Sequence, residues 1–336
     1  MTNYKTISSL VSFYTAELQN EIRTNLTFHL EDYGSVSGNS GVSKELSNLG
    51  GECLQYIKSD VQAIVCEVLD VDKTYLYMYG DKDLDAIQLA EIDKKIARYK
   101  SGEPLAYILG YKYFWGQKLK VTQDTLIPRA DTEILVQAVL DGIAGSKLFI
   151  FGTSTSLSDL GKSCSKLRVL DLGTGTGAIA LALAGELPNA EIVAVDYSAK
   201  ALEVAKENAT SNGISTVEFV QSDWYRNLDG RKFHIIVSNP PYIDSDDNDI
   251  DAEVKAYEPA SALFAEDNGL ADIEIIVSQA RCFLKSKGRL YIEHGHTQSA
   301  SVQGIFEKHG FVSIKAIKDL NGKDRCTVAK LDLLKR

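Results

Sequence analysis

Most of the sequence after residue 130 alternates between short apolar runs and helical segments, and this pattern restricts the fold more than any other feature. The runs are rich in Val, Ile and Leu, which is typical of strands buried on both faces. We expect strands over residues 167–172, 191–196, 217–221, 233–238, 289–294, 312–317 and 326–331. Helices are expected over residues 131–141, 178–185, 199–211, 270–284 and 298–309. Such alternation predicts a parallel sheet covered on both faces, finished by an antiparallel hairpin of the last two strands.

The earlier part of the chain has a different pattern, which predicts two further regions. Apolar residues recur at helical spacing from Ile7 to Lys100, so we expect a small helical domain over residues 1–103 that recognises the substrate. Aromatic residues and alternating polarity predict a β-hairpin linker over residues 104–130, followed by the α/β domain over residues 131–336. Glycine and serine mark two segments that we expect at the surface, a loop over 34–41 and an insert over 142–165.

Composition and charge narrow the classes of protein to which the chain can belong. The 336 residues are 44% hydrophobic and 24% charged, and neither a membrane-spanning run nor a signal peptide is visible, so we expect a cytoplasmic protein. The five cysteines include no Cys-x-x-Cys pair, and we expect no metal site and no disulfide framework. The net charge of −10 opposes tight, non-specific binding to nucleic acid phosphates.

A glycine-rich loop follows the first strand of the α/β pattern and leads into a helix. Glycines there let the backbone approach a ligand closely. Gly173, Gly175 and Ala178 also fit the spacing of a dinucleotide site, but Asp171 at the strand end would repel a pyrophosphate. The positively charged amino group and sulfonium of S-adenosylmethionine are instead attracted to a carboxylate. We therefore expect S-adenosyl-L-methionine as the cofactor, bound by Asp171, Gly173, Thr174, Gly175, Thr176 and Gly177.

Carboxylates and aromatic residues follow the next two strands, where they can complete a cofactor site. Asp196 ends the second strand 19 residues after Gly177 and can accept both ribose hydroxyls, or it can simply begin a helix. Tyr197 can lie against the adenine or pack at the strand end. After the third strand, Asp223 can accept the adenine amino group and Trp224 can cover the ring, although an indole can also fill a core.

The most specific segment is Asn239-Pro240-Pro241-Tyr242, directly after the fourth strand, where open α/β sheets bind their ligands. Because proline lacks an N–H, this turn offers fixed acceptors to a planar –NH2 group, either an amide or a nucleobase amine. Together with the glycine loop, it indicates methyl transfer to nitrogen. We expect Asn239 to border the cofactor, the carbonyls of Asn239 and Pro240 to accept the substrate N–H groups, and Tyr242 to pack on the amide, with no acid or base residue required.

These motifs resemble the protein-(glutamine-N5) methyltransferases of the PrmC/HemK family, which methylate the glutamine of the Gly-Gly-Gln motif in peptide chain release factors. The resemblance covers nearly the whole chain and includes Gly102-Glu103-Pro104-Leu105-Ala106-Tyr107-Ile108-Leu109-Gly110, Phe114-Trp115-Gly116, Thr125-Leu126-Ile127-Pro128-Arg129, Asp131-Thr132-Glu133, Glu258-Pro259 and Glu293-His294-Gly295. It implies a class I S-adenosylmethionine-dependent methyltransferase fold, a Rossmann-like seven-stranded sheet, with a small helical N-terminal domain and a β-hairpin linker.

The resemblance also implies roles for residues that match the family's motifs. Gly173 to Gly177 would line the methionine part of the cofactor, Asp196 would hold the ribose, and Trp224 would contact the adenine. Asn239 to Tyr242 would hold the glutamine amide of a release factor, with no membrane partner and no direct nucleic acid substrate expected. The chain departs from the family at Ala130, where a proline that would start a helix is usual.

Three other functions share parts of this pattern. An adenine-N6 or guanine-N2 methyltransferase acting on RNA or DNA fits the same acceptor geometry, but the acidic charge opposes it. A glutamine methyltransferase of a ribosomal protein uses the same chemistry, and the Asp131-Thr132-Glu133 pattern favours the release factor enzyme. A non-catalytic protein that only binds the cofactor would be expected to have lost Asn239 or a loop glycine, and this chain has both.

Overall fold

The computed structural model describes residues 5–34, 56–145, 166–246 and 252–332. It divides into two compact units, Met1–Leu109 and Gly110–Arg336, each with a hydrophobic core of its own. Within the described ranges, no helix is both long and apolar enough to cross a membrane. The domain boundaries at residues 103 and 130 stay predictions.

The first unit is helical, as expected. Its helix α4 begins with a capping box, in which the Asp85 carboxylate accepts from the backbone amides of Ile87 and Gln88 and the Gln88 side chain accepts from the Asp85 amide. One face of α4 buries Ile92 and Ile96 in the core of this unit. The helices are α1 (Ile7–Gly34), one over residues 56–69, α3 (Lys73–Met78), α4 (Ala86–Lys100) and α5 (Leu105–Leu109). Of the expected loop over 34–41, all but Gly34 lies outside the described residues.

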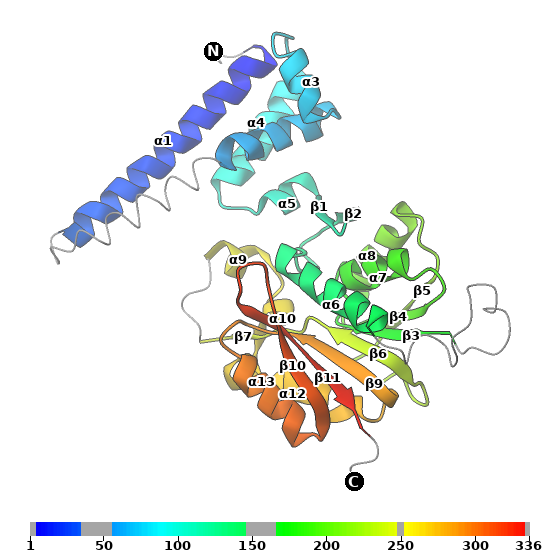
Figure 1. Cartoon of the computed structure of the whole chain (residues 1–336). Coiled ribbons are helices and arrows are strands. Elements are labelled where there is room, and N and C mark those ends of the chain that lie inside the picture. The colour runs from blue at the N-terminus through cyan, green and yellow to red at the C-terminus, as the bar shows by residue number, and fades with distance from the viewer. Residues whose placement is uncertain (1–4, 35–55, 146–165, 247–251, 333–336) are drawn as a thin grey trace. The chain divides into compact units, whose positions relative to one another are not determined.

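The second unit is built on a seven-stranded sheet, which Figure 1 shows among its covering helices. The strands are β3 (Arg168–Leu172), β4 (Glu191–Asp196), β5 (Val217–Gln221), β6 (Phe233–Ser238), β9 (Leu284–Glu293), β10 (Phe311–Lys318) and β11 (Asp324–Leu331). Their order is β10-β11-β9-β6-β3-β4-β5, and the five strands from β9 to β5 are parallel. The expected seven-stranded, mostly parallel sheet is therefore confirmed. The order of the strands reverses between β3 and β6, which is where such sheets bind ligands.

The last two strands form the expected antiparallel hairpin, with β11 inserted between β10 and β9. Strand β9 begins at Leu284, five residues before the expected start at residue 289, and the preceding helix ends at Ala280. The ladder from β9 to β6 is irregular between Leu284 and Arg289, and Lys287 there has a positive φ of 63°. An irregular, polar strand start has no alternation by which the sequence could reveal it.

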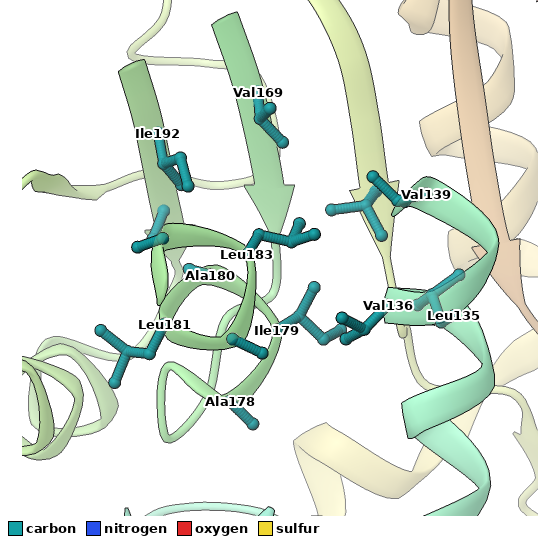
Figure 2. Packing of buried hydrophobic residues seen from close by; sticks show 14 of the residues in the cluster. Leu135, Val136, Val139, Val169, Ala178, Ile179, Ala180, Leu181, Leu183 and Ile192 are labelled. Carbon is teal, nitrogen blue, oxygen red and sulfur yellow. The ribbon is translucent and has the colours of Figure 1, made fainter. Parts of the chain in front are cut away.

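Helices cover both faces of the sheet. On one face, α6 (Glu133–Ala144) and α7 (Ala178–Glu186) pack against Val169 of β3 and Ile192 of β4, as Figure 2 shows. On the other face, α12 (Ala271–Ala280) and α13 (Ser299–Lys308) pack against the alternate residues of the strands. Helix α8 (Ala199–Ser211), like β4, β5 and β6, has the bounds expected from the sequence.

The β-hairpin is shorter than expected and belongs to the core of the second unit. Its strands are β1 (Tyr111–Phe114) and β2 (Gln117–Lys120), whereas residues 106–109, expected to be part of it, lie in helix α5. Phe114 and Leu119 are buried in the same core as α6 and α7. The Asn208 side chain on α8 exchanges two hydrogen bonds with the Lys120 backbone, at 2.6 and 3.0 Å, and so fastens β2 to the second unit.

The expected insert over 142–165 begins later than the sequence suggested, because α6 continues to Ala144. Gly142 lies inside this helix, where an added Cβ would meet the Tyr291 hydroxyl at 2.0 Å, so the glycine permits close packing of α6 on β9. Its carbonyl accepts a hydrogen bond from Arg289 at 2.7 Å. Residues 146–165 lie outside the described part of the chain. The turn η1 (Ala130–Thr132) precedes α6 without the family's proline.

Between β6 and α12 the chain forms short elements that the sequence did not predict. They are β7 (Ile243–Asp244), α9 (Ala252–Tyr257), α10 (Ala260–Leu263), β8 (Phe264–Ala265) and α11 (Glu266–Gly269). Elements of two to six residues are too short to show a period in the sequence. Of these elements, α10 contributes Ser261 and Ala262 to the lining of the cavity described next, together with Pro259 just before it.

Candidate active site

A cavity of about 430 Å³ opens at the carboxyl ends of β3, β4, β5 and β6. All of its lining residues belong to the second unit. Eight residues predicted from the sequence line it. Seven were predicted to bind the cofactor, namely Gly173, Gly175, Asp196, Tyr197, Asp223, Trp224 and Asn239, and the eighth is Pro241 of the Asn-Pro-Pro-Tyr turn. The fold therefore brings together residues that lie up to 68 positions apart, because parallel strands all end at the same edge.

The glycine loop is held in place by backbone hydrogen bonds to β4. The amides of Gly173 and Thr174 both donate to the carbonyl of Val195 at 2.9 Å. Gly175 has a φ of 55°, and an added Cβ there would meet no atom within 4 Å, so its backbone faces open space in the cavity. A ligand can therefore approach the main chain at this point without a side chain in between.

Four of the predicted cofactor residues do not line the cavity; they support the loop from within. The Asp171 carboxylate is fully buried and accepts a hydrogen bond of 2.6 Å from the Thr174 hydroxyl. Burial raises the pKa of Asp171 to about 7, a shift that this hydrogen bond opposes. Thr176 is buried as well, and Gly177 lets α7 pack closely, since an added Cβ would lie 3.1 Å from Leu181. A direct contact of these residues with the cofactor stays a prediction.

Asp196 at the end of β4 connects the glycine loop after β3 to the loop after β4. Its Oδ2 accepts from the Gly175 amide at 2.8 Å and its Oδ1 accepts from the Ser198 amide at 2.9 Å. Burial raises the pKa of this carboxyl, and the backbone hydrogen bonds act in the opposite direction. A carboxylate has about four acceptor positions, so Asp196 can hold both loops and still accept hydroxyl groups from a ligand. Tyr197 beside it is 76% exposed, at the rim of the cavity.

Trp224 forms one wall of the cavity and is fixed in its orientation. Its φ of 46° is unusual for a residue with a side chain. The ring lies 3.5 Å from the position of a Cβ on Gly173, and the indole hydrogen-bonds to the Asp272 carboxylate on α12. Burial raises the pKa of Asp272, while the indole hydrogen bond opposes this shift. Nothing in the sequence pattern singled out Asp272, because its helix was expected only from apolar periodicity.

Asn239 lies between the cavity and the interior of the protein. Its side-chain Nδ2 donates to the Thr132 hydroxyl of η1 at 3.2 Å. Pro240 is buried outside the lining, and Tyr242 turns its hydroxyl to the Glu293 carboxylate at 3.3 Å. Burial raises the pKa of Tyr242 well above its ordinary value. The roles expected for Pro240 and Tyr242 toward a substrate stay predictions.

A second wall of the cavity consists of two loops that the sequence did not assign to the site. Residues 123–126 follow the hairpin, and Pro259, Ser261 and Ala262 come from the segment that contains α10. Glu258, almost fully buried, joins the two loops: it accepts from the Ile127 amide at 3.0 Å and pairs with Arg129. The motifs around residues 125–129 and 258–259 were visible in the sequence, but their meeting depends on the fold.

The cavity fits S-adenosylmethionine in the chemistry of its walls. The cavity wall offers three kinds of group. The backbone is accessible at Gly173 and Gly175, the Asp196 carboxylate can accept the two hydroxyls of a ribose, and the Trp224 indole can cover a flat adenine ring. Among the described residues, no group of three or more His, Cys, Asp or Glu side chains could hold a metal ion.

Comparison with known proteins identifies both parts of the chain. The methyltransferase small domain matches residues 140–316, and the PrmC N-terminal domain matches residues 53–110. A release factor glutamine methyltransferase from Francisella tularensis subsp. tularensis is 57% identical over 283 residues, which are 84% of this chain and 94% of that protein. The protein of the same name from Vibrio cholerae is 43% identical over 81% of this chain and 88% of its own length.

Among solved structures, a methyltransferase from Pyrococcus furiosus matches 72% of this chain and all of its own, with 15% identity and a TM-score of 0.46. The two family models confirm the helical N-terminal part and the class I methyltransferase part that the resemblance implied. With a relative 57% identical over most of both proteins, the chain belongs to the family of release factor glutamine methyltransferases.

Proposed function

We propose that this enzyme transfers a methyl group from S-adenosyl-L-methionine to the side-chain amide nitrogen of the glutamine in the Gly-Gly-Gln motif of peptide chain release factors. The observation that carries the proposal is the position of Asn239, which lines the cofactor cavity while its amide nitrogen is already bound to Thr132. Its amide oxygen thus remains as an acceptor beside the cavity. The names of the relatives support the release factor as substrate.

S-adenosyl-L-methionine is the cofactor of this enzyme, and when bound it supplies a methyl group on a sulfonium that keeps the electron pair of the broken bond. Gly173 and Gly175 would hold it through their backbone, Asp196 would accept its ribose hydroxyls, and Trp224 would cover its adenine. Asp272 fixes the Trp224 ring in advance, so little side-chain freedom is lost on binding.

The protein's own contribution to the reaction is to orient a weak nucleophile. An amide nitrogen shares its lone pair with the carbonyl, so it reacts only if it is held in line and its electron density is raised. The Asn239 oxygen accepts one N–H of the substrate amide, and the Pro240 carbonyl accepts the other. Tyr242 excludes water from the turn, and the proton leaves the product nitrogen afterwards without a base from the protein.

The substrate protein is large, so a second surface must select it. We place this role on the helical domain predicted over residues 1–103, which lies within the first unit, and place the enzyme in the cytoplasm, where release factors act. The match of residues 53–110 to the N-terminal domain of the same family supports the assignment. Deletion of this helical domain should abolish methylation of the intact factor in a protein that still binds cofactor.

The test is transfer of a labelled methyl group to purified release factor, to the same factor with its Gly-Gly-Gln glutamine replaced, to ribosomal proteins, and to bulk tRNA, rRNA and DNA. The enzymes are wild type, Asn239→Ala and the exposed control Asn321→Ala. We expect label on the unmodified factor alone, with the control as active as wild type and Asn239→Ala nearly inactive. Label on RNA or DNA instead would mean that the Asn-Pro-Pro-Tyr turn binds a nucleobase amine. Label on a ribosomal protein would mean that the enzyme methylates a glutamine of that protein.

A further inference from the structure

A series of hydrogen bonds runs from the carboxyl end of β9 to the Asn239 amide. It begins at Glu293, the last residue of β9, whose Oε1 accepts from the Thr132 hydroxyl at 3.2 Å. The Thr132 hydroxyl in turn accepts from Asn239 Nδ2, also at 3.2 Å. Glu293 and Thr132 are 1% and 4% exposed, and neither lines the cavity. Three segments that are far apart in the sequence thus meet at one side chain that borders the site.

The direction of this series of hydrogen bonds is set by its inner end. An ionised carboxylate can only accept, so the single hydroxyl hydrogen of Thr132 must be directed to Glu293. The hydroxyl lone pairs are then available only to a donor, which is the –NH2 end of the Asn239 amide. With its nitrogen so engaged, the amide is fixed in one of its two possible orientations, and its oxygen is the end that is left for the substrate.

We propose that Thr132 and Glu293 are positioning residues that hold Asn239 as a hydrogen-bond acceptor and thereby make the site selective for an –NH2 group. The inference rests on the proposed function and deepens it. If Asn239 turned over, its –NH2 would face the site and would favour an acceptor such as a carboxylate oxygen. A glutamine amide and a glutamate carboxylate have nearly the same shape, so the orientation of Asn239 distinguishes them by hydrogen bonding rather than by size.

The surroundings of Glu293 connect this arrangement to pH. Its Oε2 is buried without a hydrogen-bond partner, and the charged or titratable groups that face it are Tyr242, Arg325, Asp131 and Cys326. Burial raises the pKa of Glu293 to about 7, whereas Thr132, Arg325 and Tyr242 oppose this shift. A protonated carboxyl can donate to Thr132. The direction of both hydrogen bonds, from Thr132 to Glu293 and from Asn239 to Thr132, could then reverse. Substrate orientation should therefore weaken as the pH falls below 7.

The experiment compares Thr132→Val, Thr132→Ser and Glu293→Gln in the full-length enzyme with release factor as the methyl acceptor. Thr132→Val keeps the shape and removes the hydroxyl, so we expect kcat to fall about ten- to hundredfold, with KM for the factor and cofactor affinity by calorimetry nearly unchanged. Thr132→Ser should recover most of the activity. The matched control is Thr327→Val. Thr327 is buried and its hydroxyl hydrogen-bonds to His294 at 2.9 Å, but it takes no part in the hydrogen bonds between Glu293, Thr132 and Asn239, so this variant should keep wild-type kcat.

The pH profile separates positioning from a purely structural role. Wild-type kcat should decline below pH 7, while Glu293→Gln, whose side chain cannot ionise and can donate to Thr132 at any pH as a protonated carboxyl does, should have a low kcat that shows no such decline. A Thr132→Val enzyme with wild-type kcat, or a Glu293→Gln enzyme that keeps the wild-type profile, would overturn the inference. A wild-type enzyme that does not label the factor would instead overturn the proposed function, so the two failures are distinct.

Discussion

Replacing Asp171 by Asn should change how the stability of the second unit depends on pH. Asp171 is fully buried in β3, and burial raises its pKa to about 7 from an ordinary value of 3.8. Because the folded protein holds this proton more tightly than the unfolded chain, protonation stabilises the fold. That stabilisation is complete below pH 3.8 and is lost as the pH rises to about 7. Asn cannot ionise, so the variant should not show this loss.

The size of the effect follows from the two pKa values. A difference of about 3 pH units, at 1.36 kcal/mol for each, corresponds to roughly 4 kcal/mol of stability lost by the wild type between pH 4 and 7. The sequence pI of about 5.1 makes work near pH 5 impractical because a protein without net charge associates. Between pH 5.5 and 8.5, the stability of Asp171→Asn relative to wild type should therefore rise by about 2 kcal/mol.

Denaturant unfolding followed by tryptophan fluorescence measures this quantity in the full-length protein. The chain has two tryptophans, Trp115 and Trp224, and both lie in the second unit, so the signal reports that unit alone. Exposed Asp229→Asn is the matched control, because it makes the same substitution at a carboxylate that folding does not remove from water. If the stability of Asp171→Asn relative to wild type does not change between pH 5.5 and 8.5, the reasoning that burial of this charge is costly is refuted.

Three further predictions concern the cavity. Asp196→Ala should raise the Kd for S-adenosylmethionine about ten- to hundredfold in calorimetry, since hydrogen bonds to a charged acceptor are lost. Trp224→Leu should raise the same Kd several-fold, because aromatic contact beyond simple burial contributes about 1 kcal/mol. In Gly269→Ala, the new Cβ would lie 2.1 Å from the Tyr242 carbonyl, so kcat should fall about a hundredfold with unchanged cofactor binding. Gly322→Ala is also strained by its positive φ but lies in open space outside the cavity, so its kcat should stay unchanged.

Most of the fold could be predicted because local patterns specify it. Strands β4, β5 and β6 and helix α8 have the predicted bounds, since apolar periodicity and turn residues mark both of their ends. Prediction was wrong where the local signal was weak or where a contact overrode it. Gly142 looked like a loop residue, yet it allows α6 to pack on Tyr291, and residues 106–109 looked like a strand but form helix α5.

The sequence by itself determined the fold class and which strand ends carry the site. Seven of the predicted cofactor residues line one cavity, because the position of a residue after a parallel strand suffices to place it at that edge.

Only the tertiary structure decided which of these residues face the cavity and which support it. Asp171 and Thr174 turn inward, and Tyr242 turns to Glu293. The order of residues in the chain contains no information on such directions, because they depend on burial and on hydrogen bonds between distant segments. Thr132 and Glu293 are 161 positions apart, and the fold alone makes them neighbours behind Asn239.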